Sequence, residues 1–178
     1  MQGDAYLKCI DIHCGLEYPI KSTNVQCENG HLLDVKYKNK PSDTLKEVFY
    51  QRRNPQGNIF NESGVWRFRE LLNFCQIDTE NIEECSKYLV SLDGAEGRQS
   101  KPYQMSKAAE FIGISNNKLW LQPEGYNPSG SFKDNGMASA VTHAKMVGAK
   151  KIVCASTGNT SASAGMFAAN EGIHCDVY

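Results

Sequence analysis

The sequence lacks a long hydrophobic run, an excess of charge of either sign and any internal repeat. No apolar stretch approaches the roughly 20 residues that a helix needs to cross a bilayer, so we expect no membrane contact. Lys and Arg number 19 against 20 Asp and Glu, a formal net charge of -1, whereas nucleic-acid binders usually carry a basic excess. The first residues, MQGDAYLKC, have no basic start followed by an apolar stretch, so we expect no signal peptide.

The cysteines do not form the even set that a disulfide framework needs. Seven are present, and an odd number without a secretory signal indicates reduced thiols in the cytoplasm. Cys154 lies in the apolar run KIVCA, where we expect a small core residue. With 178 residues, of which 40% are hydrophobic, the chain has room for one ordinary domain and a small appendage.

Three segments of different character divide the chain. Residues 1–37 hold three cysteines and two histidines around the turn glycines Gly15 and Gly30, which indicates a small, degenerate zinc-ribbon-like β unit. Residues 38–104 form a second segment, for which we expect helices and a long loop. Residues 105–178 read as the first part of an α/β domain that is truncated at its C-terminal end.

The third segment alternates between strand-like and helix-like stretches. Short apolar or β-branched runs predict strands at 117–122, 151–155 and 173–178, and the last two are expected to be buried. The stretches between them, 131–148 and 160–172, predict helices that end at glycines. Strands joined through helices by short loops are parallel with right-handed crossovers, so we expect a βαβαβ unit.

Two loops of this unit carry polar residues where a strand end meets a helix start. Lys133 lies in the first turn of its helix, where the helix dipole favours the neutral amine that Schiff-base chemistry needs. In the next loop, Ser, Thr and Asn side chains surround Gly158, and such a loop can hold a carboxylate or a phosphate. Together the loops predict a site for an anionic, carbonyl-bearing cofactor. On the residues alone, an exposed helix lysine and an ordinary capping loop remain the alternatives.

The two loops also carry a family resemblance. NPSGSFKDNGM followed by ASTGNTSAS resembles the threonine synthase family of pyridoxal-phosphate enzymes, which have the tryptophan synthase β-like fold, fold type II. GVWRFRELL is similar to the N-terminal segment of that family, and the resemblance covers most of residues 5–178. It implies a partial α/β fold of this type, preceded by the small Cys-containing unit.

The resemblance implies roles for particular residues. Lys133 matches the Schiff-base lysine that carries pyridoxal phosphate and shuttles protons, and Asn159 matches the amide that bonds the ring hydroxyl of the cofactor. Phe132 matches the aromatic residue beside the cofactor. Three residues of the second loop match those that hold the substrate carboxylate: Ser156, Thr157 and Thr160.

The implied reaction converts O-phospho-L-homoserine and water to L-threonine and phosphate, in an enzyme that is a homodimer when full length. In the family, the glycine-rich cradle for the cofactor phosphate and the group facing the pyridine nitrogen follow later in the chain. Neither has a counterpart before Tyr178. We therefore expect an N-terminal fragment that holds the lysine half of the site, binds the cofactor poorly alone and has no turnover.

Two other functions stay open at this point. A related fold type II enzyme, such as a threonine dehydratase or serine racemase, would usually show a Ser-Ser-Gly-Asn-His loop where this chain has STGNTSAS. A truncated, non-catalytic remnant whose N-terminal unit binds another protein would belong to a different class altogether. Substrate tests distinguish the threonine synthase reaction from that of a related fold type II enzyme. Measurable turnover distinguishes either enzyme from a non-catalytic remnant.

Four residues near the N-terminus are candidate metal ligands: Cys9, Cys14, Cys27 and His31. Ordinary zinc ribbons place two residues between paired ligands. Here four residues separate Cys9 from Cys14 and three separate Cys27 from His31, and His13 is a substitute candidate. The spacing favours a small β unit with free thiols, and a zinc site at these residues stays the less favoured alternative.

Overall fold

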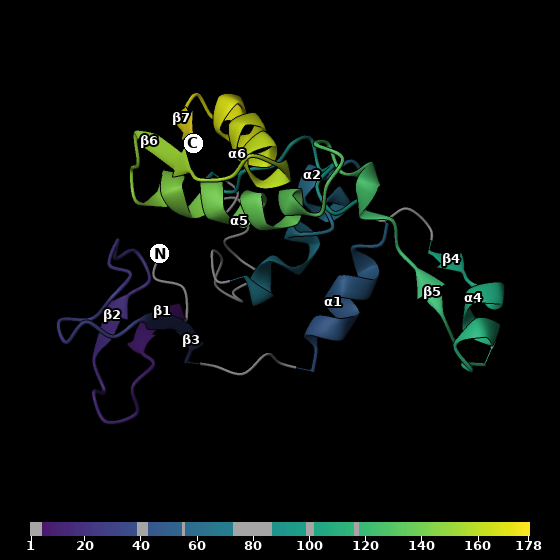
Figure 1. The fold of residues 1–178 in the computed structure, drawn as a ribbon, viewed down its shortest axis with the longest axis horizontal. Coiled ribbons are helices and arrows are strands. Elements are labelled where there is room, and N and C mark those ends of the chain that lie inside the picture. The colour runs from purple at the N-terminus through teal and green to yellow at the C-terminus, as the bar shows by residue number, and fades with distance from the viewer. Residues whose placement is uncertain (1–4, 39–42, 55, 73–86, 99–101, 116–117) are drawn as a thin grey trace.

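The protein has a mixed α/β fold with three small sheets (Figure 1). The computed structural model describes residues 5–38, 43–54, 56–72, 87–98, 102–115 and 118–178. Helices α5 (Lys133–Met146) and α6 (Asn159–Asn170) lie in the middle of the molecule, and the N-terminal sheet and a small arm lie at opposite ends (Figure 1). Within the described residues, no helix is long and apolar enough to cross a membrane.

The N-terminal sheet is antiparallel, in the order β2-β1-β3. Its strands are β1 (Ala5–Cys9), β2 (Glu17–Pro19) and β3 (Leu33–Tyr37). The central strand places Leu7 opposite Tyr18 on one side and Val35 on the other. Few apolar side chains of this unit are buried, namely Ala5, Cys9, Ile20 and Cys27. Burial of apolar surface therefore contributes little to its stability.

The second segment contains three short helices, α1 (Leu45–Gln51), α2 (Ile59–Glu62) and the 3-10 helix η1 (Trp66–Leu71). The sequence predicts a longer α-helix over 64–74, but Phe68 has non-helical φ and ψ of -108° and 25°. The sequence also predicts Ser63 as the cap of this helix, whereas the N-cap position of η1 is occupied by Val65. Ser63 Oγ nevertheless accepts hydrogen bonds from the amides of Val65 (3.1 Å) and Trp66 (3.0 Å).

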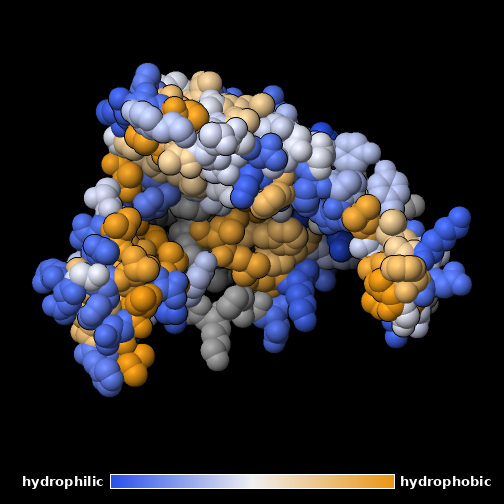
Figure 2. Space-filling view, in the orientation of Figure 1, coloured by the Kyte–Doolittle hydropathy of each residue, from blue (hydrophilic) through white to orange (hydrophobic). Residues whose placement is uncertain are grey.

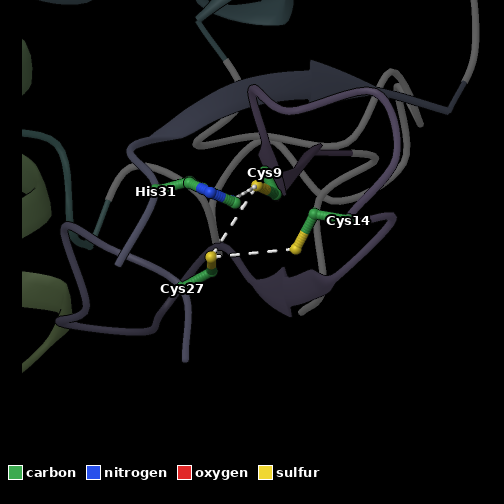
Figure 3. A group of neighbouring side chains, drawn as sticks. All are labelled: Cys9, Cys14, Cys27 and His31. Carbon is green, nitrogen blue, oxygen red and sulfur yellow. Dashed lines mark hydrogen bonds between the residues drawn. The ribbon is translucent and has the colours of Figure 1, made fainter. Parts of the chain in front are cut away.

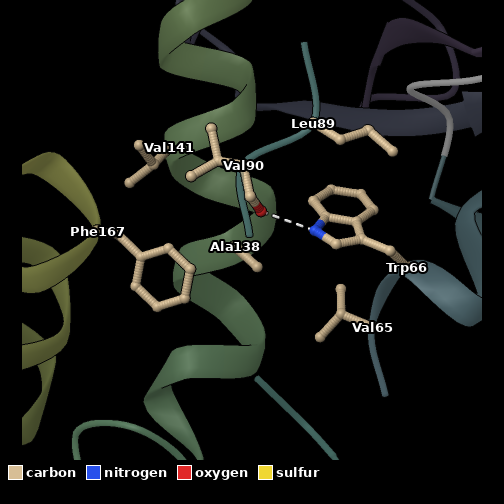
Figure 4. Packing of buried hydrophobic residues seen from close by; sticks show 7 residues of the cluster. All are labelled: Val65, Trp66, Leu89, Val90, Ala138, Val141 and Phe167. Atoms are coloured by element: carbon tan, nitrogen blue, oxygen red, sulfur yellow. Dashed lines mark hydrogen bonds between the residues drawn. The ribbon is translucent and has the colours of Figure 1, made fainter. Parts of the chain in front are cut away.

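The hydrophobic core forms around Trp66, which is fully buried (Figure 4). Its indole nitrogen donates a 2.7 Å hydrogen bond to the carbonyl of Val90, and the Val90 amide donates to Thr142 Oγ1 of α5 at 2.9 Å. Two hydrogen bonds thus hold the segment at Val90 between η1 and α5. The other buried members of this cluster are Val65, Leu89, Ala138, Val141 and Phe167.

The buried face of α5 differs from the one that its apolar residues predict. The sequence favours a face made of Met137, Ala140, Val141, Ala144 and Val147, whereas the structure buries Asp134, Ala138, Val141 and Thr142. Two of these are polar, and both make hydrogen bonds inside the protein. Ala140, Ala144 and Val147 instead line a groove beside the N-terminal unit.

The parallel unit has two strands in the structure, β6 (Lys151–Cys154) and β7 (His174–Val177), connected through α6. The strand expected over 117–122 does not join them. It is β5 (Trp120–Leu121), which pairs antiparallel with β4 (Tyr103–Gln104). A long connection places α4 (Ser106–Phe111) between β4 and β5, so the three form the separate arm of Figure 1.

Strand β6 is half-exposed rather than buried. Ile152 packs against the core cluster, but Val153 is 62% exposed because successive side chains of a strand face opposite sides. Cys154 is half-buried, so the expectation of a core cysteine is wrong. On the arm, Phe111 is 91% exposed, and apolar side chains gather there (Figure 2).

Two backbone segments approach each other closely at Gly64 and Gly97. The Gly64 amide donates a 2.9 Å hydrogen bond to the carbonyl of Glu96. A Cβ atom added at Gly64 would lie 1.6 Å from the carbonyl oxygen of Gly97. The segment before η1 can therefore pack against residues 96–97 only with glycine at this position.

We predict that Gly64→Ala destabilises the protein by about 3 kcal/mol or more, because backbone cannot yield as a side chain does. Urea unfolding gives the free energy of unfolding of each variant. The control is Gly165→Ala in α6, where an added Cβ has no atom within 4 Å. That change should stabilise the helix by about 0.5–1 kcal/mol. If Gly64→Ala and the unmodified chain had the same free energy of unfolding, the close approach of the backbone at Gly64 to Gly97 would be contradicted.

Candidate functional site

Lys133 is the first residue of α5, as the sequence predicts for the first turn of a helix. Its amide donates a 3.2 Å hydrogen bond to Ser131 Oγ. Its Nζ lies 4.5 Å from the centre of the exposed Phe132 ring, a cation–π contact. Among the described residues, Nζ has no hydrogen-bond or ion-pair partner. The structure thus presents a half-buried primary amine at the positive end of a helix without a carboxylate to hold it.

The neighbouring residue, Asp134, anchors this helix start. Its carboxylate is fully buried and accepts hydrogen bonds from the Ser129 amide (2.8 Å), Ser129 Oγ (2.5 Å) and Ser163 Oγ (2.5 Å). Ser129 belongs to the loop before α5, and Ser163 to the second turn of α6. One side chain therefore fixes the lysine loop and both helix starts relative to one another.

Sequence reasoning did not single out Asp134. The available signal is an acidic residue in the first turn of a helix, where it interacts favourably with the helix dipole. That signal is common on exposed helices, and it does not reveal that the carboxylate is buried against α6. Only the pairing with Ser163, 29 residues further along the chain, distinguishes it.

A second anchor is Asn127, which is buried in the lysine loop. Its Oδ1 accepts from the Gly97 amide at 2.7 Å, and its Nδ2 donates to the carbonyl of Ser131 at 2.9 Å. Glu124 accepts from Asn135 Nδ2 at 2.9 Å, so the start of the loop also contacts α5. These contacts tie the lysine loop to the segment that ends at Gly97.

That segment is a folded turn, where the sequence predicts a loop. Glu96 is fully buried and accepts hydrogen bonds from Ser91 Oγ (2.7 Å) and the Leu92 amide (2.9 Å). Both carboxylate oxygens thus have partners within the turn, which offsets the cost of burying them. The turn presents the Gly97 amide to Asn127 in a defined position.

The second predicted loop connects β6 to α6. Ser161 Oγ donates to the carbonyls of Ser156 and Gly158, the latter at 2.9 Å, and the Gly158 amide donates to Ser156 Oγ at 3.3 Å. These contacts close the loop on itself. The Ser156 hydroxyl, predicted to hold a substrate carboxylate, therefore already takes part in the loop's own structure.

The remaining predicted residues of this loop present unpaired side chains. Thr157 and Asn159 are exposed and Thr160 is half-buried, and in the described part of the chain their side chains have no hydrogen-bond partner. The first amides of a helix also lack partners within the helix. The start of α6 therefore offers an amide, two hydroxyls and backbone N–H groups to a ligand.

The two helix starts lie side by side, because Ser163 of α6 contacts Asp134 of α5. Lys133 precedes Asp134, and Asn159 lies one turn before Ser163. The arrangement joins a free primary amine with neutral donors at two positive helix ends. These residues fit a group that carries an aldehyde and anionic substituents, as pyridoxal phosphate does.

The four N-terminal candidates also come together in space. The ligand atoms of Cys9, Cys14, Cys27 and His31 all lie within 4.8 Å of one another (Figure 3). His13, the substitute candidate, is exposed and lies outside this group. The irregular spacing that disfavoured a metal in the sequence does not keep the four residues apart.

We predict that Asp134→Asn lowers the free energy of unfolding by about 1.5–3 kcal/mol, because an amide cannot replace a buried carboxylate that accepts three hydrogen bonds. Chemical denaturation followed by tryptophan fluorescence measures this loss. Ser139→Ala, on the same helix, is the control, since the Ser139 side chain has no hydrogen-bond partner among the described residues. A loss no greater than that of Ser139→Ala would contradict the anchoring role.

Comparison with known proteins relates the chain to one enzyme family. A family described as pyridoxal-phosphate dependent enzyme matches residues 101–178, the part that holds both loops. Threonine synthase of Methanocaldococcus jannaschii is 34% identical over 167 residues, which are 93% of this chain and 36% of that protein. Threonine synthase of Methanosarcina acetivorans is 34% identical over 169 residues, 94% of this chain and 35% of that protein.

A shorter stretch is more similar. Threonine synthase of Mycobacterium leprae is 60% identical over 59 residues, 33% of this chain and 16% of that protein. The chain spans about a third of the length of the curated relatives that it matches along most of its sequence. Residues 101–178 thus match the family of pyridoxal-phosphate-dependent enzymes, and the chain along most of its length is similar to part of the threonine synthases.

Proposed function

We propose that this chain carries the lysine-bearing part of the active site of a fold type II threonine synthase. The observation that carries the proposal is the unpaired Lys133 amine at the start of α5, held beside the start of α6 by the contact between Asp134 and Ser163. Both helix starts lie within the residues that match the pyridoxal-phosphate-dependent family. The relatives named threonine synthase supply the choice of reaction.

Lys133 would hold the cofactor through the aldehyde of pyridoxal phosphate. The Asn159 amide, which has no partner in the described chain, would donate to the ring hydroxyl, and Phe132 would pack beside the ring. When bound, the cofactor supplies an electron sink for carbanion chemistry. The loop of Ser156, Thr157 and Thr160 would bind the substrate carboxylate through its hydroxyls and the free amides of the helix start.

The proposed reaction is the conversion of O-phospho-L-homoserine and water to L-threonine and phosphate. The Lys133 amine would take the protons at Cα and then Cβ of the substrate, and phosphate would leave from Cγ. The amine would then return one proton to Cγ, water would add its hydroxyl at Cβ, and a second proton would return to Cα. The contacts of Asp134 keep the lysine backbone fixed while its side chain moves. We propose that the cradle for the cofactor phosphate and the partner of the pyridine nitrogen lie outside these 178 residues. The full-length protein would be a homodimer.

Attachment of the cofactor tests the role of Lys133. Pyridoxal phosphate at high concentration, followed by borohydride, should leave a stable label on the Lys133 peptide, as detected by mass spectrometry. Lys133→Ala should lose this label, and Lys150→Ala is the matched control because Lys150 is an exposed lysine near the same helix. The same label and absorbance band in Lys133→Ala would show that Lys133 is not the anchor.

Turnover tests the rest of the proposal. We predict that the 178-residue chain alone releases no phosphate from O-phospho-L-homoserine, because half of the site is missing. Turnover of about 1 per second or faster, as in ordinary enzymes, would contradict this. Reading the source gene past codon 178 comes first, since a continuing frame with a glycine-rich loop supports the proposed enzyme. Activity of the longer protein on threonine or serine instead would favour a dehydratase or racemase.

A further inference from the structure

Three of the distances among the ligand atoms of Cys9, Cys14, Cys27 and His31 match the edges of a metal-centred tetrahedron, and all four atoms lie within 4.8 Å of one another. Zinc bonds of about 2.3 Å to sulfur and 2.0–2.1 Å to nitrogen give edges of about 3.8 Å between sulfurs and 3.6 Å between sulfur and nitrogen. The Sγ atom of Cys27 lies 3.9 Å from that of Cys14 and 3.7 Å from that of Cys9. Cys9 Sγ lies 3.5 Å from His31 Nδ1. The sulfurs are too far apart for disulfides, which need about 2.05 Å.

Two backbone turns bring the four ligands to one point. Cys9 ends β1, and the chain turns through the bond from the Cys14 amide to the Asp11 carbonyl, 3.2 Å. In the second turn, the Cys27 amide donates to the carbonyl of His31 at 2.8 Å. Gly15, with φ of 66°, directly follows the first turn, and Gly30, with φ of 79°, lies in the second. Each pair of ligands thus comes from its own tight turn, which makes the unusual spacing compatible with a tetrahedral site.

The surroundings of the four residues suit a metal as well. His31 directs Nδ1 at Cys9, and its Nε2 lies 3.7 Å from Asp11 Oδ2. A carboxylate behind a histidine is the usual arrangement that orients a zinc ligand. The Asp11 amide donates to Cys9 Sγ at 3.4 Å, and Asn29 Nδ2 donates to Cys14 Sγ at 3.3 Å. Such donors disperse the negative charge that three thiolates leave after neutralising a divalent ion.

The N-terminal unit also needs a source of stability. Its strands and turns span residues 5–37, and two of its four buried apolar side chains are ligands of the cluster. Units below about 40 residues usually require disulfides, a metal or a partner to remain folded. Since the cysteines are free thiols and no disulfide joins them, a bound metal is an internal stabiliser that this unit can supply itself.

We propose that Cys9, Cys14, Cys27 and His31 bind one structural Zn²⁺ ion, with Asp11 orienting His31. The ion closes the two turns onto each other and holds the β2-β1-β3 sheet together. Four protein ligands leave no open position for a substrate, so the site is structural and not catalytic. A tetrahedral site of three thiolates and one imidazole selects zinc over harder divalent ions.

The zinc unit rests against the helix that begins with Lys133. His143 Nε2 of α5 lies 2.9 Å from the carbonyl of Ile20, just after β2. The groove between them is lined by Leu7 and Leu33 of the unit and by Ala144 of α5. Removal of the metal should unfold the unit and leave the core around Trp66 intact, because the two share few buried side chains.

Elemental analysis of the whole chain, purified without added metal, tests the proposal. We expect about one zinc per chain, lost in Cys27→Ser and in His31→Ala. Two matched controls should keep the zinc: Cys175→Ser, whose half-buried thiol lies in β7, and His13→Ala, whose exposed ring lies outside the cluster. His31→Cys should also keep it, because a fourth thiolate satisfies the same tetrahedron.

A further measurement guards against loss of zinc through general misfolding. Urea unfolding followed by tryptophan fluorescence, measured in a Trp120→Phe background so that Trp66 alone reports, should show the same core transition with and without Cys27→Ser. Cobalt in place of zinc should show the visible bands of tetrahedral coordination. Zinc far below one equivalent in the unmodified chain, equal zinc in Cys27→Ser, or iron in its place would overturn the proposal. Lys133→Ala should keep its zinc, so this test is independent of the proposed enzyme function.

Discussion

The buried carboxylate of Asp134 is the interaction on which the candidate site depends. It joins the loop before α5 to α6 through Ser129 and Ser163, and so it places the two helix starts side by side. A buried carboxylate is stable only when its oxygens are satisfied, and here hydroxyl and amide donors and the helix dipole supply this. The Lys133 amine, one residue earlier, is thereby displayed on a rigid backbone without being neutralised by an ion pair.

Contacts elsewhere in the fold also hold the lysine loop in position. Trp66 packs in the core and fixes the Val90 segment against α5 through two hydrogen bonds. The close contact of Gly64 with residues 96–97 orders the turn that presents the Gly97 amide to Asn127. A site built on such packed elements keeps its functional groups in position more precisely than one on free loops. The scaffold thus determines the position of the lysine loop from two independent sides.

The N-terminal unit follows a different physical principle. The central helices are held by burial of side chains such as Phe167, whereas the β2-β1-β3 sheet has almost no core of its own. In the proposed zinc site, the four ligands would replace the missing apolar contacts, and their ligand atoms lie within 4.8 Å of one another. The two parts meet at α5 through His143 and Ile20, so a stable N-terminal unit covers the outer face of the helix that carries Lys133.

Local patterns sufficed to predict the helices at α5 and α6, the strands β6 and β7 and the Lys133 loop, because capping, periodicity and turn glycines act over a few residues. They did not predict the antiparallel pairing of β5, the exposure of Val153 or the buried face of α5. The spacing of the ligands also did not reveal that Cys9 and His31 approach each other. The types of the residues did not indicate that Asp134 contacts Ser163. These features depend on contacts between residues 16 to 29 positions apart, and only the folded chain brings such partners within reach.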